Sequence, residues 1–84
     1  MYYTYLLRCR DDSLYCGYTS SIEKRLKAHM SGKGARYTRS HIPERIVYFE
    51  IHNTRSEAMM RECEIKKLTK EQKEALISPE RKHG

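Results

Sequence analysis

Two short stretches near the beginning of the sequence, joined by a turn, limit the folds open to this chain. Residues 2–9 (YYTYLLRC) and 14–19 (LYCGYT) are rich in aromatic, β-branched and apolar side chains, which favour strands. Residues 10–13 (RDDS) carry the aspartates and the serine that are typical of turns. We therefore predict that the two stretches pair as an antiparallel β-hairpin.

The rest of the sequence adds helical patterns and one more strand. Residues 21–31, 55–68 and 70–77 are predicted helices, and residues 45–51 (RIVYFEI) are a predicted strand. Each helix begins at a pair with capping-box spacing: Ser20 with Glu23, Thr54 with Glu57, and Thr69 with Gln72. The order ββαβαα predicts an α+β fold, in which a small three-stranded antiparallel sheet (2–8, 14–19 and 45–51) is flanked by helices.

The chain contains no linker, internal repeat or low-complexity segment, so residues 1–84 are expected to form a single, monomeric domain. Its core is expected over about residues 2–77, with residues 78–84 as a frayed tail. Cys9, Cys16 and Cys63 are odd in number and form no C-x-x-C motif, so we expect reduced thiols that act as small buried residues. Together with the lack of a signal-like apolar N-terminus, this favours a cytoplasmic protein.

The charge of the chain indicates the kind of partner it binds. Lys and Arg number 17 against 11 Asp and Glu, which gives a net charge of +6. For so small a chain this favours a polyanion, and nucleic acid before an anionic membrane surface. No apolar run is long enough to span a membrane.

The first predicted helix places two polar side chains where apolar ones are expected. Ile22, Leu26 and Met30 form a narrow apolar stripe, and Arg25 and His29 lie on or beside it. An unpaired charge at an inward position is costly. Taken singly, Arg25 would be read as the partner of a surface carboxylate and His29 as a satisfied core histidine.

Other polar side chains are predicted to gather near this pair. Glu62 borders the inward apolar stripe of the second helix, and Tyr5 and Tyr15 lie on the hairpin, where cross-strand packing alone would also explain them. With Arg25 and His29 they could converge on one end of the sheet. Phosphodiester cleavage needs such a set: a carboxylate for a divalent ion, a cation for the phosphate, and a group that deprotonates water.

The order of these residues resembles the GIY-YIG nuclease family, and within it the small stand-alone bacterial members. YTY (3–5) stands where the family has GIY, and YCG (15–17) stands where it has YIG. The spacing Y-x-G-x-T-x5-R-x3-H is matched by Tyr15, Gly17, Thr19, Arg25 and His29. EAMMRECEIKK (57–67) resembles the helix that carries the family's metal-binding glutamate, which falls on Glu62.

The resemblance implies a role for each site residue. Arg25 and His29 would face the scissile phosphate, and Glu62 would hold Mg²⁺ or Mn²⁺. Tyr5 would be the general base, with Tyr15 and His29 orienting the water or relaying its proton, while Gly17 would be structural. Many larger members carry an asparagine after the glutamate helix, and residues 68–77 (LTKEQKEALI) contain none.

A basic loop and one helical lysine are predicted to contact the nucleic acid. Cations there would neutralise phosphates and an aromatic ring would stack on a base. The residues concerned are Lys33, Arg36, Tyr37, Arg39 and Lys66. A merely solvated loop is the alternative interpretation.

These features predict a metal-dependent nuclease that hydrolyses phosphodiester bonds in DNA, structure-selectively or non-specifically, in repair or processing, with RNA as an alternative substrate. The first rival is a non-catalytic nucleic-acid-binding module that keeps the fold. The second is a structural or interaction protein. Glu62 disfavours both, because a carboxylate repels phosphate unless a cation intervenes. Sequence-specific cutting would require a protein partner, since nothing in the chain resembles a specificity domain.

Overall fold

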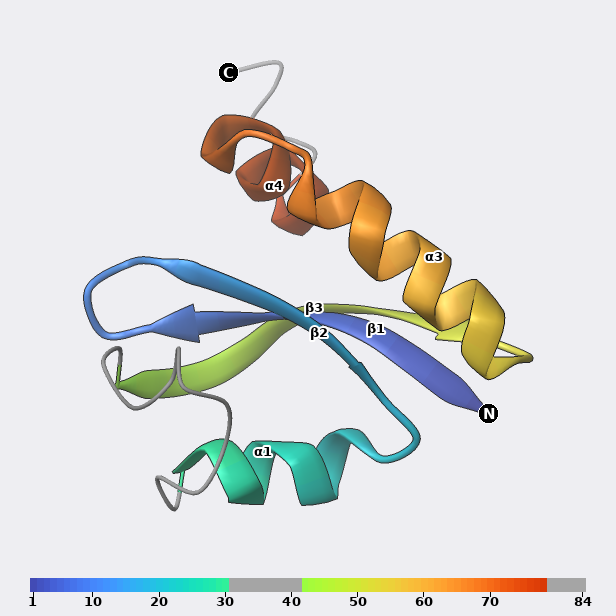
Figure 1. Cartoon of the computed structure of the whole chain (residues 1–84). Coiled ribbons are helices and arrows are strands. Elements are labelled where there is room, and N and C mark those ends of the chain that lie inside the picture. The colour runs from blue at the N-terminus through green and yellow to red at the C-terminus, as the bar shows by residue number, and fades with distance from the viewer. Residues whose placement is uncertain (31–41, 79–84) are drawn as a thin grey trace.

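The centre of the fold is a three-stranded antiparallel sheet, seen in a computed structural model that describes residues 1–30 and 42–78, without the side chains of His29 and Met30. β1 (Tyr2–Cys9) lies between β2 (Leu14–Thr19) and β3 (Pro43–His52), so the strand order is β2-β1-β3 (Figure 1). In the register Tyr5 stands opposite Gly17 on β2 and opposite Phe49 on β3. Because opposite residues share a face of the sheet, this register decides which side chains meet.

Helices cover both faces of the sheet. α1 (Ile22–Met30) lies on one face, and α3 (Arg55–Lys66) and α4 (Lys70–Ile77) lie on the other (Figure 1). The predicted capping boxes at Thr54 and Thr69 are both present. The expected α+β fold is confirmed.

The face under α3 and α4 holds the larger apolar core. Leu6, Cys16 and Ile65 are buried there, and residues of β3 and α4 pack around them. The Thr4 hydroxyl donates a hydrogen bond of 2.8 Å to the Ala58 carbonyl oxygen. This bond fixes α3 to the central strand, which matters because α3 carries Glu62.

An ion pair holds α4 to the C-terminal end of β1. The Arg8 guanidinium donates to both carboxylate oxygens of Glu74, at 2.5 and 2.7 Å. This hydrogen-bonded contact lowers the pKa of Glu74. A bidentate pair of this kind holds the last helix over the sheet with a defined orientation.

Several boundaries differ from those predicted. β3 begins at Pro43 rather than at residue 45, because a proline can take the first position of a strand, where it need not donate a hydrogen bond. The first helix is preceded by Ser21, whose hydroxyl accepts from the Lys24 N–H, and not capped by Ser20. Residues 31–41 of the predicted loop (31–45) lie outside the described residues, as does the tail after Ser78, and the last three residues of that loop belong to β3.

The cysteines follow the prediction in part. Cys9 and Cys16 are buried free thiols, and burial raises the pKa of Cys16 to about 12, which keeps it protonated. Cys63 is exposed on α3, so its assignment as a buried residue was wrong. Its position two residues before the buried Ile65 turns it towards solvent.

Candidate active site

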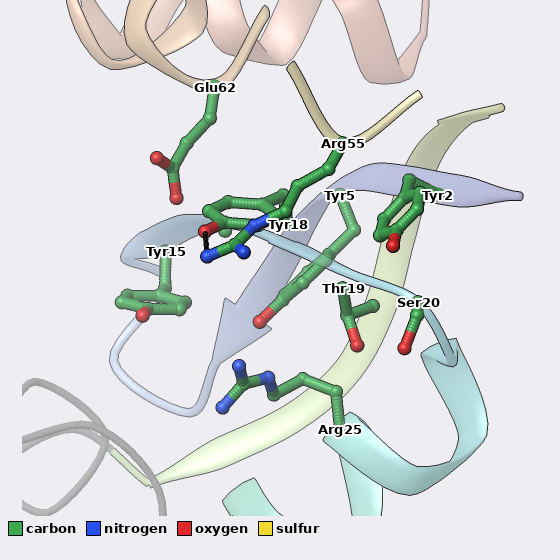
Figure 2. A pocket seen from close by; sticks show the side chains of 10 residues that line it. Tyr2, Tyr5, Tyr15, Tyr18, Thr19, Ser20, Arg25, Arg55 and Glu62 are labelled. Atoms are coloured by element: carbon green, nitrogen blue, oxygen red, sulfur yellow. Dashed lines mark hydrogen bonds between the residues drawn. The ribbon is translucent and has the colours of Figure 1, made fainter. Parts of the chain in front are cut away.

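A cleft of about 510 Å³ opens beside β2, which is an edge strand of the sheet. Its walls come from both faces of the sheet: Arg25 reaches it from α1, and Glu62 and Arg55 reach it from α3 (Figure 2). The lining residues are Tyr2, Tyr5, Tyr15, Gly17, Tyr18, Thr19, Ser20, Arg25, Arg55 and Glu62. Four of the five predicted catalytic residues are therefore in one cavity.

Gly17 brings the two predicted catalytic tyrosines together. A Cβ atom at this position would lie 2.6 Å from the Tyr5 hydroxyl oxygen and 3.2 Å from a ring carbon of Tyr15. Because Gly17 has no Cβ atom, the Tyr5 ring can pass directly against β2. The centroids of the Tyr5 and Tyr15 rings are 6.4 Å apart. The glycine is required here by close approach of a side chain to the strand.

The variant Gly17→Ala is expected to lose both stability and any activity of the cleft. Alanine suits a strand better than glycine, but here it would displace the buried Tyr5 ring, at an overpacking cost of about 1–3 kcal/mol in the free energy of unfolding. Urea denaturation measures this cost, and Cys63→Ala on the exposed side of α3 is the control. Unchanged or increased stability would contradict the close approach.

The Tyr5 side chain is almost completely buried, with 1% of its surface exposed. Burial, followed by the neighbouring Tyr15, raises the pKa of the Tyr5 hydroxyl, while the Arg25 guanidinium lowers it. Tyr5 therefore keeps its proton in the protein alone. A further positive charge in the cleft would act in the same direction as Arg25 and favour the tyrosinate.

Arg25 differs from its expected inward position. Arg25 is exposed, so the prediction that its charge is buried on the inward face of the helix was wrong. Its side chain nevertheless extends along the sheet into the cleft (Figure 2). No carboxylate among residues 1–30 and 42–78 lies within ion-pair distance of it. A guanidinium in this state can bind an anion that enters the cleft.

Glu62 is the carboxylate of the cleft. It lies between the buried Ala58 and Ile65 on α3, which turns it towards the sheet, and 17% of its side chain is exposed. The Lys66 ammonium is 3.7 Å from one of its oxygens. Lys66 itself is more than half exposed and is not among the residues that line the cleft.

A divalent cation fits this position. Mg²⁺ is commonly held by one or two carboxylates together with water and substrate phosphate oxygens, so a single partly exposed Glu62 facing an anion-binding cleft is a suitable donor. In the part of the chain that the structure describes, no group of three or more His, Cys, Asp or Glu side chains could form a complete protein cage. Binding would therefore depend on the substrate as well as on Glu62.

Four lining residues were missed in the sequence, and one of them, Ser20, was assigned only as a helix cap. Tyr2 and Tyr18 belong to the predicted strands and Arg55 to the predicted helix over residues 55–68, and none of the three was assigned a role in the site. In the structure the Arg55 guanidinium donates to the Tyr18 hydroxyl at 3.2 Å and lies 5.9 Å from the centroid of its ring (Figure 2). The only signal was their proximity to the YIG-like stretch and to the helix of Glu62.

The other predicted site residues lie wholly or partly outside the part of the chain that the structure describes. The side chain of His29 lies outside the described residues. The same holds for the loop residues Lys33, Arg36, Tyr37 and Arg39.

Comparison with known proteins identifies the family. The family model of the GIY-YIG catalytic domain matches residues 1–75, which is most of the chain. The chain belongs to the GIY-YIG nuclease family. In this GIY-YIG domain the two motif stretches, residues 3–5 and 15–17, meet at one pair, in which Tyr5 stands opposite Gly17. The hairpin register therefore brings the last residue of one motif stretch to the last residue of the other.

Relatives of similar length share this domain. A UPF0213 protein of Bacillus licheniformis is 51% identical over 99% of this chain and 86% of that protein. Another, from Clostridium perfringens, is 54% identical over 93% of this chain and 84% of that protein. The solution NMR structure of a UPF0213 protein from Bacillus halodurans is 46% identical, with a TM-score of 0.58 over 93% of this chain and 84% of that chain. Within residues 1–30 and 42–78, no helix combines the length and apolarity needed to cross a membrane.

Proposed function

We propose that this GIY-YIG domain is a divalent-metal-dependent nuclease that hydrolyses phosphodiester bonds in DNA, non-specifically or according to DNA structure, in repair or processing. The observation that carries the proposal is the convergence of Tyr5, Tyr15, Arg25 and Glu62 on one cleft. A basic chain of net charge +6 supports a polyanionic substrate.

Each side chain has a physical task in this proposal. Arg25 would bind the scissile phosphate and neutralise the negative charge that develops on its oxygens. Tyr5 would act as the tyrosinate: it would first lose its own proton to solvent, a loss favoured by the positive charge of Arg25, and its phenolate oxygen would then take the proton of the attacking water. Tyr15, whose ring lies 6.4 Å from that of Tyr5, would orient the water together with His29.

Glu62 would hold Mg²⁺ or Mn²⁺. The cation supplies Lewis-acid polarisation of the phosphate and stabilises the leaving oxygen. It also accounts for a carboxylate in a cleft meant for an anion, because Glu62 alone would repel phosphate. The Lys66 ammonium, 3.7 Å from a Glu62 carboxylate oxygen, would compensate part of this charge when no divalent ion is bound. When a divalent ion is bound, Lys66 would contact the nucleic acid instead.

The cleavage assay tests the proposal directly. We expect purified protein to cut labelled DNA with Mg²⁺ or Mn²⁺ and not with EDTA, since removal of the cation removes the task of Glu62. Single-stranded, duplex and flapped DNA, and the matching RNAs, should be compared in parallel. Metal-dependent cleavage of RNA alone would overturn the choice of DNA.

The same assay separates the proposal from its rival. A non-catalytic binding module would bind these substrates and leave them intact under every metal condition. Tight binding without cleavage, in protein shown to be folded by its circular dichroism, would therefore overturn the assignment as a nuclease.

A further inference from the structure

The two arginines that line the cleft differ in their partners from three other arginines of the fold. Arg8, Arg45 and Arg61 each lie within 3.2 Å of a carboxylate oxygen. In the described part of the chain, no carboxylate lies within ion-pair distance of Arg25 or Arg55. The cleft thus presents two guanidinium groups that have no ion-pair partner in the described part of the chain.

Arg55 is held in place by a neutral partner. Its guanidinium donates to the Tyr18 hydroxyl at 3.2 Å and lies 5.9 Å from the centre of that ring, so Tyr18 restricts its position without cancelling its charge. Arg55 is the first residue of α3 and Tyr18 belongs to β2, so two elements far apart in sequence build the contact. A guanidinium positioned in this way keeps donors available for an incoming anion.

The positions of the two arginines suit the binding of neighbouring phosphates of one nucleic-acid strand. Arg25 enters the cleft from the side of α1, whereas Arg55, like Glu62, enters from the side of α3 (Figure 2). Phosphates recur at every nucleotide, so a strand whose scissile phosphate is bound by Arg25 must pass further phosphates along the cleft. A second cation on the other wall can bind one of them.

We propose that Arg55, positioned by Tyr18, forms a second phosphate subsite that binds a phosphodiester adjacent to the scissile one. The proposal rests on the assignment of the cleft as a nucleic-acid site. It makes Arg55 a substrate-positioning residue, which fixes the course of the strand around the edge of β2 and past Glu62. Tyr18 acts through Arg55 and has no separate contact with phosphate.

The test is equilibrium binding of fluorescently labelled DNA, single-stranded and duplex, in EDTA at salt concentrations from about 50 to about 200 mM. Arg55→Gln is expected to weaken binding by about tenfold for every sequence alike, as expected when one charge-assisted contact is lost. The slope of log K against log salt should fall by about 0.7 for a single strand or about 0.9 for a duplex. Tyr18→Phe should give a smaller loss with the slope nearly kept.

Lys70→Gln is the matched control. Lys70 is also the first residue of a helix that begins with a capping box, it is exposed, and it lies outside the cleft. It should change neither affinity nor slope by a comparable amount. An equal loss in both variants, or an unchanged Arg55→Gln, would overturn the subsite.

The measurement also distinguishes this proposal from the nuclease assignment. Protein that binds DNA through Arg55 but never cuts it would support the subsite and overturn catalysis. If instead the wild type cuts DNA and the Arg55→Gln variant binds DNA as tightly as the wild type, the nuclease assignment is supported and the subsite is overturned. Thermal unfolding of each variant establishes that the exposed substitutions leave the fold intact.

Discussion

Glu62→Gln is expected to reduce DNA cleavage by about a thousandfold or more while the protein stays folded. Glutamine keeps the shape of the side chain but removes the charge that would hold the divalent cation, whose stabilisation of the reacting phosphate is several kcal/mol. Since about 1.4 kcal/mol corresponds to a factor of ten in rate, the loss should be several factors of ten. Single-turnover cleavage with saturating Mg²⁺ measures it.

DNA binding by Glu62→Gln should not be weakened as cleavage is. In EDTA, Glu62→Gln should bind DNA at least as tightly as the wild type, because a negative charge facing the phosphate is gone. Glu64→Gln is the matched control, since Glu64 lies on the same helix but is exposed and pairs with Arg61 at 3.2 Å. If Glu62→Gln kept full activity, Glu62 would be only the partner of Lys66.

Arg25→Ala is expected to lower the cleavage rate by about 10²–10³, the usual effect of removing one preorganised donor at a developing oxyanion. Arg25→Lys should recover only part of this loss, because an ammonium lacks the planar pair of donors of a guanidinium. Lys24→Ala, the neighbouring exposed residue on α1, is the control for net charge. Rates are compared at saturating DNA, so that weaker binding does not contribute.

The two losses are not expected to add. Arg25 and Glu62 would serve the same chemical step, so the double variant should be scarcely slower than the poorer single variant. Fully additive losses would indicate independent tasks and contradict a shared site. Both positions border the core without filling it, so each variant should unfold near the wild-type temperature.

Much of the site could be predicted because local rules place its residues. Period-two alternation puts Tyr15 and Gly17 on one face of β2, and the short turn over residues 10–13 fixes the register that brings Tyr5 opposite Gly17. Helical spacing likewise places Glu62 between the buried Ala58 and Ile65. The pattern on each element was therefore enough for these residues.

Other features depended on how the elements are arranged in space. Tyr18 points to the opposite face of β2 from Gly17, so alternation excluded it from the site. It nevertheless lines the cleft because β2 is an edge strand and the cavity continues around that edge to α3. Arg25 looked inward on a helical projection, but α1 leaves it at the border of the sheet, where it is exposed. Strand order and helix placement are not encoded in any single element.

The order along the chain of the elements that build the cleft has a consequence for biosynthesis. The hairpin and α1, which carry Tyr5, Tyr15 and Arg25, are complete by Met30, whereas α3 begins only at Arg55. A nascent chain on the ribosome thus contains Tyr5, Tyr15 and Arg25 well before it contains Arg55 and the carboxylate of Glu62. Under the proposed function, truncated translation products cannot cut nucleic acid, and cleavage begins only when synthesis has passed α3.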